Sequence, residues 1–330
     1  MIGLNINAIA TSPWHGQFVH YVDIFGTPNP DTWDAPASFS GFERVINYRV
    51  FAGDDKDTVH AGAGQDEVHG GNGKDMLFGE GGNDWLYGEA GGDFLDGGSG
   101  ADVMIGGAES GTEGDTYVVD NSGDKVVENF NEGIDEVRSF LASYTLPENV
   151  ENLFLRGTSI TGNGNELPNI IIGNGEDNFI HGWGKDDRLF GRDGNDWISG
   201  DDGNDLVMGG EGRDLLSGGI GMDTFQWANT SESGFSISSM DRIFDFNALD
   251  GDKIDLQVID ADLTTRQNNE SFKFIGSNSF DAPGQIRYDW DLSAGDLYIW
   301  LNTDNDQFAE MGIIVPYTGI LPDDDSWFVM

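Results

Sequence analysis

Hydrophobic residues recur with a period of nine over two long stretches of this chain. Six consecutive nonapeptides fill residues 52–105, and a second block of seven units runs in one phase from about residue 164 to residue 226. The eighth position of the first block is apolar throughout: Val59, Val68, Leu77, Leu86, Leu95 and Met104. A period of this length is typical of solenoids, in which each unit buries its apolar side against its neighbours.

Each nonapeptide divides into a turn and a very short strand. Six residues of the unit are rich in glycine and predict a tight turn, while the three residues around the apolar position predict an extended segment. Only one side chain per unit is expected to point inward, so the predicted core is thin. The pattern therefore predicts an all-β fold in which short parallel strands stack as a roll.

The remaining segments lose the period but keep runs that resemble strands. Residues 106–163 carry short β-branched and aromatic runs between turn residues, and the runs lengthen after residue 226. The first fifty residues are too few to bury an enzyme core, so we expect them to cover the open edge of the first coil. The predicted parts are an N-terminal capping segment (1–51), a first roll block (52–114), an irregular parallel-strand connector (115–163), a second roll block (164–226) and a β-rich C-terminal domain (227–330).

The charge balance indicates a protein that binds cations. The chain has 59 Asp and Glu against 16 Lys and Arg, a formal net charge of −43, and 49 glycines. So many like charges in a compact body need counter-charge to fold, and calcium is the natural one. Nucleic acid is excluded as a partner because its phosphates need a basic face. Cysteine is absent, which excludes disulfides and thiolate metal sites.

Aspartate at position six is the candidate metal ligand. Calcium takes six to eight oxygen ligands in flexible geometry, which carboxylates and the carbonyls of a glycine-rich turn can supply. The predicted carboxylate ligands are Asp57, Asp66, Asp75, Asp84, Asp93, Asp102, Asp187, Asp196, Asp205, Asp214 and Asp223. The predicted backbone ligands are Gly62, Gly64, Gly71, Gly73, Gly82, Gly91, Gly100, Gly194, Gly203, Gly212 and Gly221. Asn169 and Asn178 hold the same position in the first two units of the second block, where we expect them to fix the turn without a carboxylate.

The units resemble the Gly-Gly-x-Gly-x-Asp-x-U-x repeats of the RTX (repeats-in-toxin) family. This resemblance implies a right-handed parallel β-roll in which two units form one coil and a calcium ion lies between turns two units apart. It pairs Asp57 with Asp75, Asp66 with Asp84, Asp75 with Asp93, Asp84 with Asp102, Asp187 with Asp205, Asp196 with Asp214 and Asp205 with Asp223. About seven to nine ions are then expected.

The segments after the repeats resemble the C-terminal domain of serralysin-type secreted proteases, on the motifs DRIFDF (241–246) and GDKIDL (251–256). The protease signature His-Glu-x-x-His is absent from the sequence, so proteolysis is not carried over. No catalytic residue is assigned. The motifs of nucleotide-binding loops and of the serine-hydrolase elbow are also absent from the sequence.

Export is expected from three features of the chain. The start, MIGLNINAIATSPW, does not resemble a cleavable signal peptide, and no apolar run approaches the roughly 18 residues of a membrane helix. The end, DDDSWFVM, is similar to the uncleaved signals of type I secretion substrates. Calcium modules outside cells bind with Kd of about 10⁻⁴–10⁻³ M, so the repeats are expected to stay unfolded inside a bacterium and to fold outside it.

The biological target stays open at the level of sequence. A structural or interaction protein is favoured, and a polysaccharide-active enzyme of the epimerase or lyase type, or an accessory module of one, is the alternative. Trp85, Tyr87, Trp183 and Trp197 could stack on sugars or simply cover the roll. His60 and His69 recur at position nine, where exposed roll residues are favoured over a zinc site. An extracellular polysaccharide or a cell surface is therefore a candidate partner.

Overall fold

The computed structural model describes residues 5–14, 17–27, 29–35, 46–108, 113–264, 270–291, 293–317 and 325–329. The chain divides into two compact units, Met1–Leu141 with Leu146–Arg156 and Ala142–Thr145 with Gly157–Met330. The helical segments in the described ranges are two three-residue 3-10 turns, η1 (Thr230–Glu232) and η2 (Asp325–Trp327). The all-β prediction is therefore confirmed. In the part of the chain described, no helix has the length and apolar character needed to cross a membrane.

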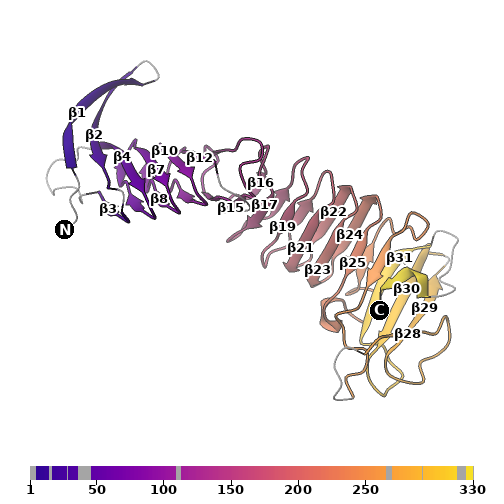
Figure 1. The fold of residues 1–330 in the computed structure, drawn as a ribbon. Coiled ribbons are helices and arrows are strands. Elements are labelled where there is room, and N and C mark those ends of the chain that lie inside the picture. The colour runs from indigo at the N-terminus through magenta and orange to yellow at the C-terminus, as the bar shows by residue number, and fades with distance from the viewer. Residues whose placement is uncertain are drawn as a thin grey trace. The chain divides into compact units, whose positions relative to one another are not determined.

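Unit 1 is a parallel roll whose strands alternate between two faces (Figure 1). One face holds β1 (Asn5–Trp14), β2 (Gln17–Phe25), β4 (Asn47–Asp54), β7 (Glu67–Asn72), β10 (Trp85–Ala90), β12 (Val103–Gly107) and β14 (Lys125–Val127). The other holds β3 (Thr32–Asp34), β5 (Thr58–His60), β8 (Met76–Phe78), β11 (Phe94–Asp96), β13 (Thr116–Val119), β15 (Glu136–Ser139) and β17 (Asn152–Leu155). A short pair, β6 (Ala63–Gly64) and β9 (Gly81–Gly82), joins two turns.

The stacking register of the roll is set by the nonapeptide phase. In β7 and β10 the paired residues Val68 and Leu86 are 18 positions apart, which is two units and therefore one coil. Every position-eight residue of both blocks is buried, with at most 1% of its surface exposed, so the predicted inward row is confirmed. Because each unit contributes one such side chain, each coil contributes two to the core, one from each face.

The N-terminal segment lies against the first strands of the roll. β1 and β2 form an antiparallel hairpin, β2 pairs in parallel with β4, and β3 pairs in parallel with β5. His15 falls outside the described residues. The capping role of this segment, like the five-part division of the chain, stays a prediction.

Unit 2 repeats the same architecture and then changes to longer strands. One face holds β19 (Ile170–Ile172), β21 (Arg188–Asp193), β23 (Leu206–Glu211), β25 (Thr224–Gln226), β27 (Lys253–Asp255) and β32 (Phe328–Val329). The other holds β16 (Ser143–Thr145), β18 (Thr161–Asn163), β20 (Phe179–His181), β22 (Trp197–Asp202), β24 (Leu215–Ile220), β26 (Asp241–Ile243), β31 (Met311–Pro316), β30 (Asp296–Asn302), β29 (Gln285–Asp291) and β28 (Lys273–Phe274). β29, β30 and β31 form an antiparallel meander at the end of this sheet.

The last described residues pack into unit 2. β32 pairs in parallel with β27, and the ring of Trp327 lies 5.1 Å from that of Phe246. Trp327 and Phe328 are buried, with 5% and 7% of their surfaces exposed. The apolar tail that the sequence presents as an export signal is thus also a strand of the folded domain. Its signal role stays a prediction, and Asp323 and Asp324 lie outside the described residues.

Candidate metal centre

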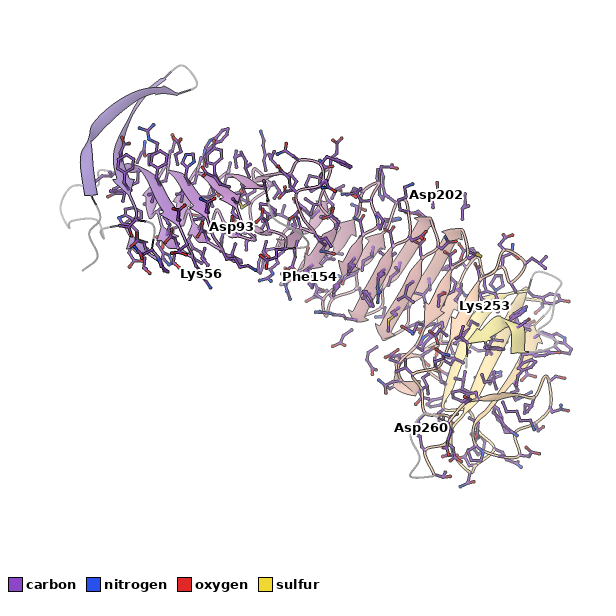
Figure 2. All side chains as sticks on the ribbon, in the orientation of Figure 1. Lys56, Asp93, Phe154, Asp202, Lys253 and Asp260 are labelled. Atoms are coloured by element: carbon purple, nitrogen blue, oxygen red, sulfur yellow. The ribbon has the colours of Figure 1, made fainter. Side chains whose placement is uncertain are left out.

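The position-six aspartates form four buried rows, two in each unit, because aspartates of alternate nonapeptides are linked to each other. All eleven predicted ligands have 2% or less of their surface exposed; Asp93, labelled in Figure 2, lies within the strand stack of unit 1. In each row the Oδ1 atom of one aspartate accepts a hydrogen bond from the backbone N–H of the aspartate 18 residues earlier. The N–H of Asp75 bonds Asp93 at 2.7 Å and that of Asp187 bonds Asp205 at 2.8 Å. All seven predicted pairs are joined in this way.

The second carboxylate oxygen of each aspartate is the feature that fits a cation. The Oδ2 atoms of all eleven are buried and have no hydrogen-bond partner. None of the eleven forms an ion pair with lysine or arginine within the described ranges. A buried carboxylate oxygen without a partner costs several kcal/mol unless a proton or a cation compensates it. The rows therefore present regularly spaced anionic oxygens inside the fold.

A backbone carbonyl faces six of these oxygens across the space beside a position-one glycine, namely those of Asp75, Asp84, Asp93, Asp187, Asp196 and Asp205. A Cβ atom on Gly70 would lie 2.5 Å from Asp75 Oδ2 and 2.8 Å from the carbonyl oxygen of Gly88. In unit 2 a Cβ on Gly200 would overlap Asp205 Oδ2 and lie 2.5 Å from the carbonyl oxygen of Gly218. A side chain at either of these glycines would fill this space, whereas the units of Asp57 and Asp66 carry Ala52 and Ala61 at position one. Oxygen donors of this kind suit calcium better than zinc.

The position-one carbonyls were missed as ligand candidates, and the predicted glycine ligands lie elsewhere in the turn. Nine of these eleven glycines, at positions two and four, have positive φ angles; Gly64 and Gly203 do not. The carbonyl oxygen of a position-four glycine points at the α-carbon of the position-four residue one coil on, as Gly64 does at Gly82. Whether positions two and four contribute metal ligands stays a prediction.

Both asparagines at position six bond within their own turns. Asn169 Oδ1 accepts the backbone N–H of Asn165 at 2.7 Å, and Asn178 Oδ1 accepts that of Asn174 at 2.8 Å. The backbone N–H groups of Asn169 and Asn178 still bond Asp187 and Asp196. The turn is therefore compatible with an amide in place of the carboxylate.

The rows continue beyond the nonapeptides, and sequence reasoning missed this continuation. The N–H of Asp93 bonds Asp115, the N–H of Asp115 bonds Asp135, and in unit 2 the N–H groups of Asp214 and Asp223 bond Asp241 and Asp252. The spacing there is 20 to 29 residues instead of 18. A usable signal was present. Each added aspartate lies two residues before a buried side chain, as in the repeats: Tyr117, Val137, Ile243 and Ile254.

Burial raises the pKa of the row aspartates. The pKa is about 8 for Asp84 and Asp187 and about 9 for Asp214, chiefly because burial penalises the charged form and secondarily because neighbouring carboxylates repel it. The N–H donated to each Oδ1 opposes the shift. The other predicted ligands have pKa values of about 6 to 7.

Protonation of these carboxyl groups at low pH is therefore expected to stabilise the fold in part when calcium is absent. A carboxyl whose pKa is higher in the folded state than in the unfolded chain stabilises the metal-free fold at low pH, and this stabilisation is lost as pH rises through about 6 to 9. In the presence of a chelator, circular dichroism should show more β structure at pH 5 than at pH 8. The calcium-saturated protein should show no such loss between these values. Equal β content of the metal-free chain at both pH values would contradict the expectation.

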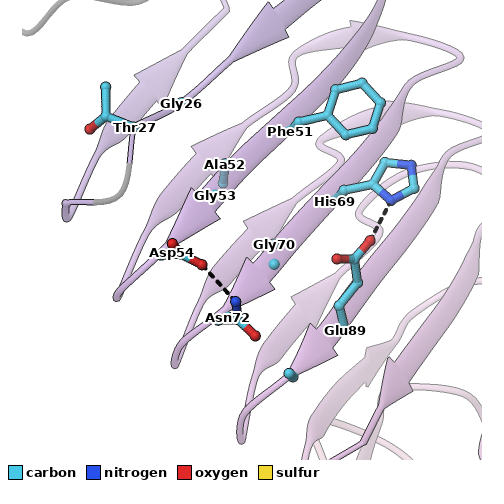
Figure 3. A pocket seen from close by; sticks show the side chains of 12 residues that line it. Gly26, Thr27, Phe51, Ala52, Gly53, Asp54, His69, Gly70, Asn72 and Glu89 are labelled. Carbon is cyan, nitrogen blue, oxygen red and sulfur yellow. Dashed lines mark hydrogen bonds and ion pairs between the residues drawn. The ribbon is translucent and has the colours of Figure 1, made fainter.

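A groove of about 540 Å³ lies on the surface of unit 1 (Figure 3). The rings of Phe51 and His69 stack along it at 4.7 Å, and His69 stacks on Tyr87 at 4.6 Å. Both faces of the His69 ring are therefore covered by neighbours. Its Nδ1 atom lies 2.8 Å from Glu89 Oε1, and Asn72 Nδ2 donates to Asp54 Oδ1 at 2.6 Å. The polar side chains that line the groove include carboxylates and an amide, and Tyr87 stacks on the His69 ring.

The described position-nine histidines each contact a carboxylate 20 residues later. His60 lies 3.1 Å from Glu80 and His181 lies 3.3 Å from Asp201, as His69 does from Glu89. These carboxylates occupy position two, where the backbone is left-handed even without glycine, with φ angles of 69° to 77°. Each of these histidines therefore contacts a residue whose backbone is in the left-handed conformation. A zinc role for the histidines stays untested.

Comparison with known proteins agrees with the geometry. The RTX calcium-binding nonapeptide repeat (4 copies) matches residues 51–86, 78–113 and 163–198, and the Peptidase M10 serralysin C terminal matches residues 202–325. No curated protein matches the sequence.

Solution structures of two subunits from the Azotobacter vinelandii mannuronan C5-epimerase are similar in part. AlgE6R3 is 25% identical over 48% of this chain and 80% of its own, with a TM-score of 0.36. AlgE6R2 is 21% identical over 50% of this chain and 93% of its own, with a TM-score of 0.34. On the sequence matches and the aspartate rows, the chain carries RTX calcium-binding nonapeptide repeats and a serralysin-type C-terminal domain.

Proposed function

We propose that this chain is a secreted protein whose rolls fold when extracellular calcium binds and then act as a structural or interaction module. The observation that carries the proposal is the set of eleven buried Oδ2 atoms without a hydrogen-bond partner, six of which face a glycine carbonyl. Without a cation these oxygens oppose folding, and with one they link successive coils. Metal binding and folding are therefore coupled.

The thin core makes the metal's contribution decisive. One buried apolar residue per unit offsets little of the conformational entropy that a glycine-rich turn loses on folding. Seven divalent ions, one for each of the seven aspartate pairs predicted within the nonapeptides, would bring the formal charge from −43 to −29. We propose about seven to nine ions, which relieve the repulsion without cancelling it.

Export to a calcium-rich medium agrees with this coupling. The serralysin-type C-terminal domain supports type I secretion, because the resemblance to secreted proteases rests on that domain. A site with Kd of about 10⁻⁴–10⁻³ M stays empty in cytosol and fills outside the cell. The chain would then cross the export channel unfolded and fold on arrival.

A calcium titration followed by circular dichroism tests the folding switch. At pH 7.5 in excess EDTA the protein should lose most of its β signal, and calcium at about 0.1–1 mM should restore it. Magnesium at the same concentration is the control and should restore much less, since it keeps its waters and demands a tighter octahedral site. Full β content in excess EDTA would refute the switch.

The interaction role needs a separate measurement. A glycan and cell-surface binding screen, run with calcium and with EDTA, should show binding only with calcium. Binding without product release favours the interaction module. New unsaturated ends or a fall in polymer viscosity would instead favour the polysaccharide-active enzyme.

A further inference from the structure

A second kind of acidic site lies in the connector of unit 1, outside the residues that match the nonapeptide repeats. Asp115, Glu128 and Asp135 each offer an oxygen within 4.8 Å of the other two. Their exposed fractions are 1%, 7% and 1%. Neither Glu128 nor Asp135 forms an ion pair with lysine or arginine in the described part of the chain. Three carboxylates therefore share one buried space.

The space beside Gly106 resembles the space beside a position-one glycine of the repeats, except that one of the surrounding oxygens comes from a different group. A Cβ on Gly106 would overlap Asp115 Oδ2 and the Tyr117 hydroxyl, and would lie 2.6 Å from Glu128 Oε1. At Gly70 the corresponding space is bounded by an aspartate Oδ2 and a glycine carbonyl. The side chain of Glu128 thus takes the place of a neutral carbonyl oxygen. The connector space carries one more negative charge than a repeat site does.

One carboxylate oxygen of Glu128 is left without a hydrogen-bond partner. Asp135 Oδ1 accepts the N–H of Asp115 at 2.8 Å, and the Tyr117 hydroxyl donates to Glu128 Oε1. Glu128 Oε2 is buried with no hydrogen-bond partner. Burial and the charge of Asp135 raise the pKa of Glu128 to about 9, which shows how poorly this space tolerates uncompensated charge.

We propose that Asp115, Glu128 and Asp135 bind one divalent cation of the calcium type beyond the last nonapeptide of the first block. Carboxylate oxygens favour a hard cation, and affinity for calcium rises with the number of charged ligands. This site is therefore expected to fill at lower free calcium than the repeat sites. It adds an ion that the nonapeptide motif does not predict.

The test counts ions on the full chain at saturating free calcium, by equilibrium dialysis with elemental analysis. Glu128→Gln should bind one ion fewer than the wild type and should lose the step that fills at the lowest calcium. Glu148→Gln is the matched control, because Glu148 is an exposed glutamate of the same connector, and it should keep the wild-type count. Circular dichroism at saturating calcium checks that each variant is folded.

A second variant tests the same site independently, in case Glu128→Gln does not fold. Asp135→Asn keeps an acceptor for the Asp115 N–H and should also bind one ion fewer. If both variants retain the wild-type count, the trio shares protons instead of a cation and the inference is overturned. A wild type that binds no calcium at all would refute the proposed function, so the two failures are distinguishable.

Discussion

Replacing Gly212 with alanine is expected to destabilise the second roll by about 3–5 kcal/mol, which is at the upper end for a single substitution. Gly212 has a φ of 144°, and a Cβ there would overlap the carbonyl oxygen of Gly194, one coil earlier. The carbonyl oxygen belongs to the backbone and the backbone fixes the position of a Cβ, so only separation of the coils relieves the overlap. Urea unfolding at saturating calcium should show a large fall in the midpoint.

Gly175→Ala is the control for this variant. Gly175 lies in a turn of the same block, has no positive φ, and a Cβ there would meet no atom within 4 Å. Its substitution should change the midpoint little or raise it slightly, since alanine reduces the entropy of the unfolded chain. Equal midpoints for the two variants would show that the coils are less closely packed at position four than described.

Replacing Asp205 with asparagine is expected to raise the calcium concentration needed for folding by at least about tenfold, in line with the losses seen when metal sites lose supporting groups. An amide oxygen at this position can still accept the N–H of Asp187, which bonds Asp205 Oδ1. Asn169 and Asn178 show that the turn accommodates an amide, whose oxygen there accepts an N–H of its own turn. The substitution replaces the partnerless Oδ2 with an amide NH₂ or a neutral oxygen. The variant should fold at high calcium, with a shifted midpoint in a calcium titration by circular dichroism.

Asp202→Asn removes the same charge from the same nonapeptide and serves as the control. Asp202 is exposed, so its substitution should leave the calcium midpoint within about twofold of the wild type. A tenfold shift in both variants would attribute the effect to net charge. No shift in either would remove Asp205 from the ligand set.

The aspartate rows were predictable because a strict period places every sixth position at the same point of successive coils. The phase alone joins Asp57 to Asp75 and Asp187 to Asp205, and the backbone bonds follow that pairing. The position-one glycines were expected to serve backbone flexibility. In the structure Gly70 instead leaves room between Asp75 Oδ2 and a carbonyl oxygen, a role that only neighbouring coils define.

What lay beyond the period could not be predicted from spacing. Asp115 and Asp241 join the rows after intervals of 22 and 27 residues, because loops of different length are excluded from the stack. Glu128 enters its site from a different strand region, so no local motif links it to Asp115. The burial of Trp327 beside Phe246 depends on a long-range contact that the terminal sequence does not reveal.

The hydrogen bonds along the aspartate rows all point one way. Each turn takes its acceptor from a later part of the chain, and the last two turns of the second block take theirs from Asp241 and Asp252. Within each unit the row acceptor of a turn is therefore supplied by the next coil toward the C-terminus. A chain that ended before Asp241 would therefore leave the backbone N–H groups of Asp214 and Asp223 without these acceptors, so the boundary of the second roll lies beyond its last nonapeptide.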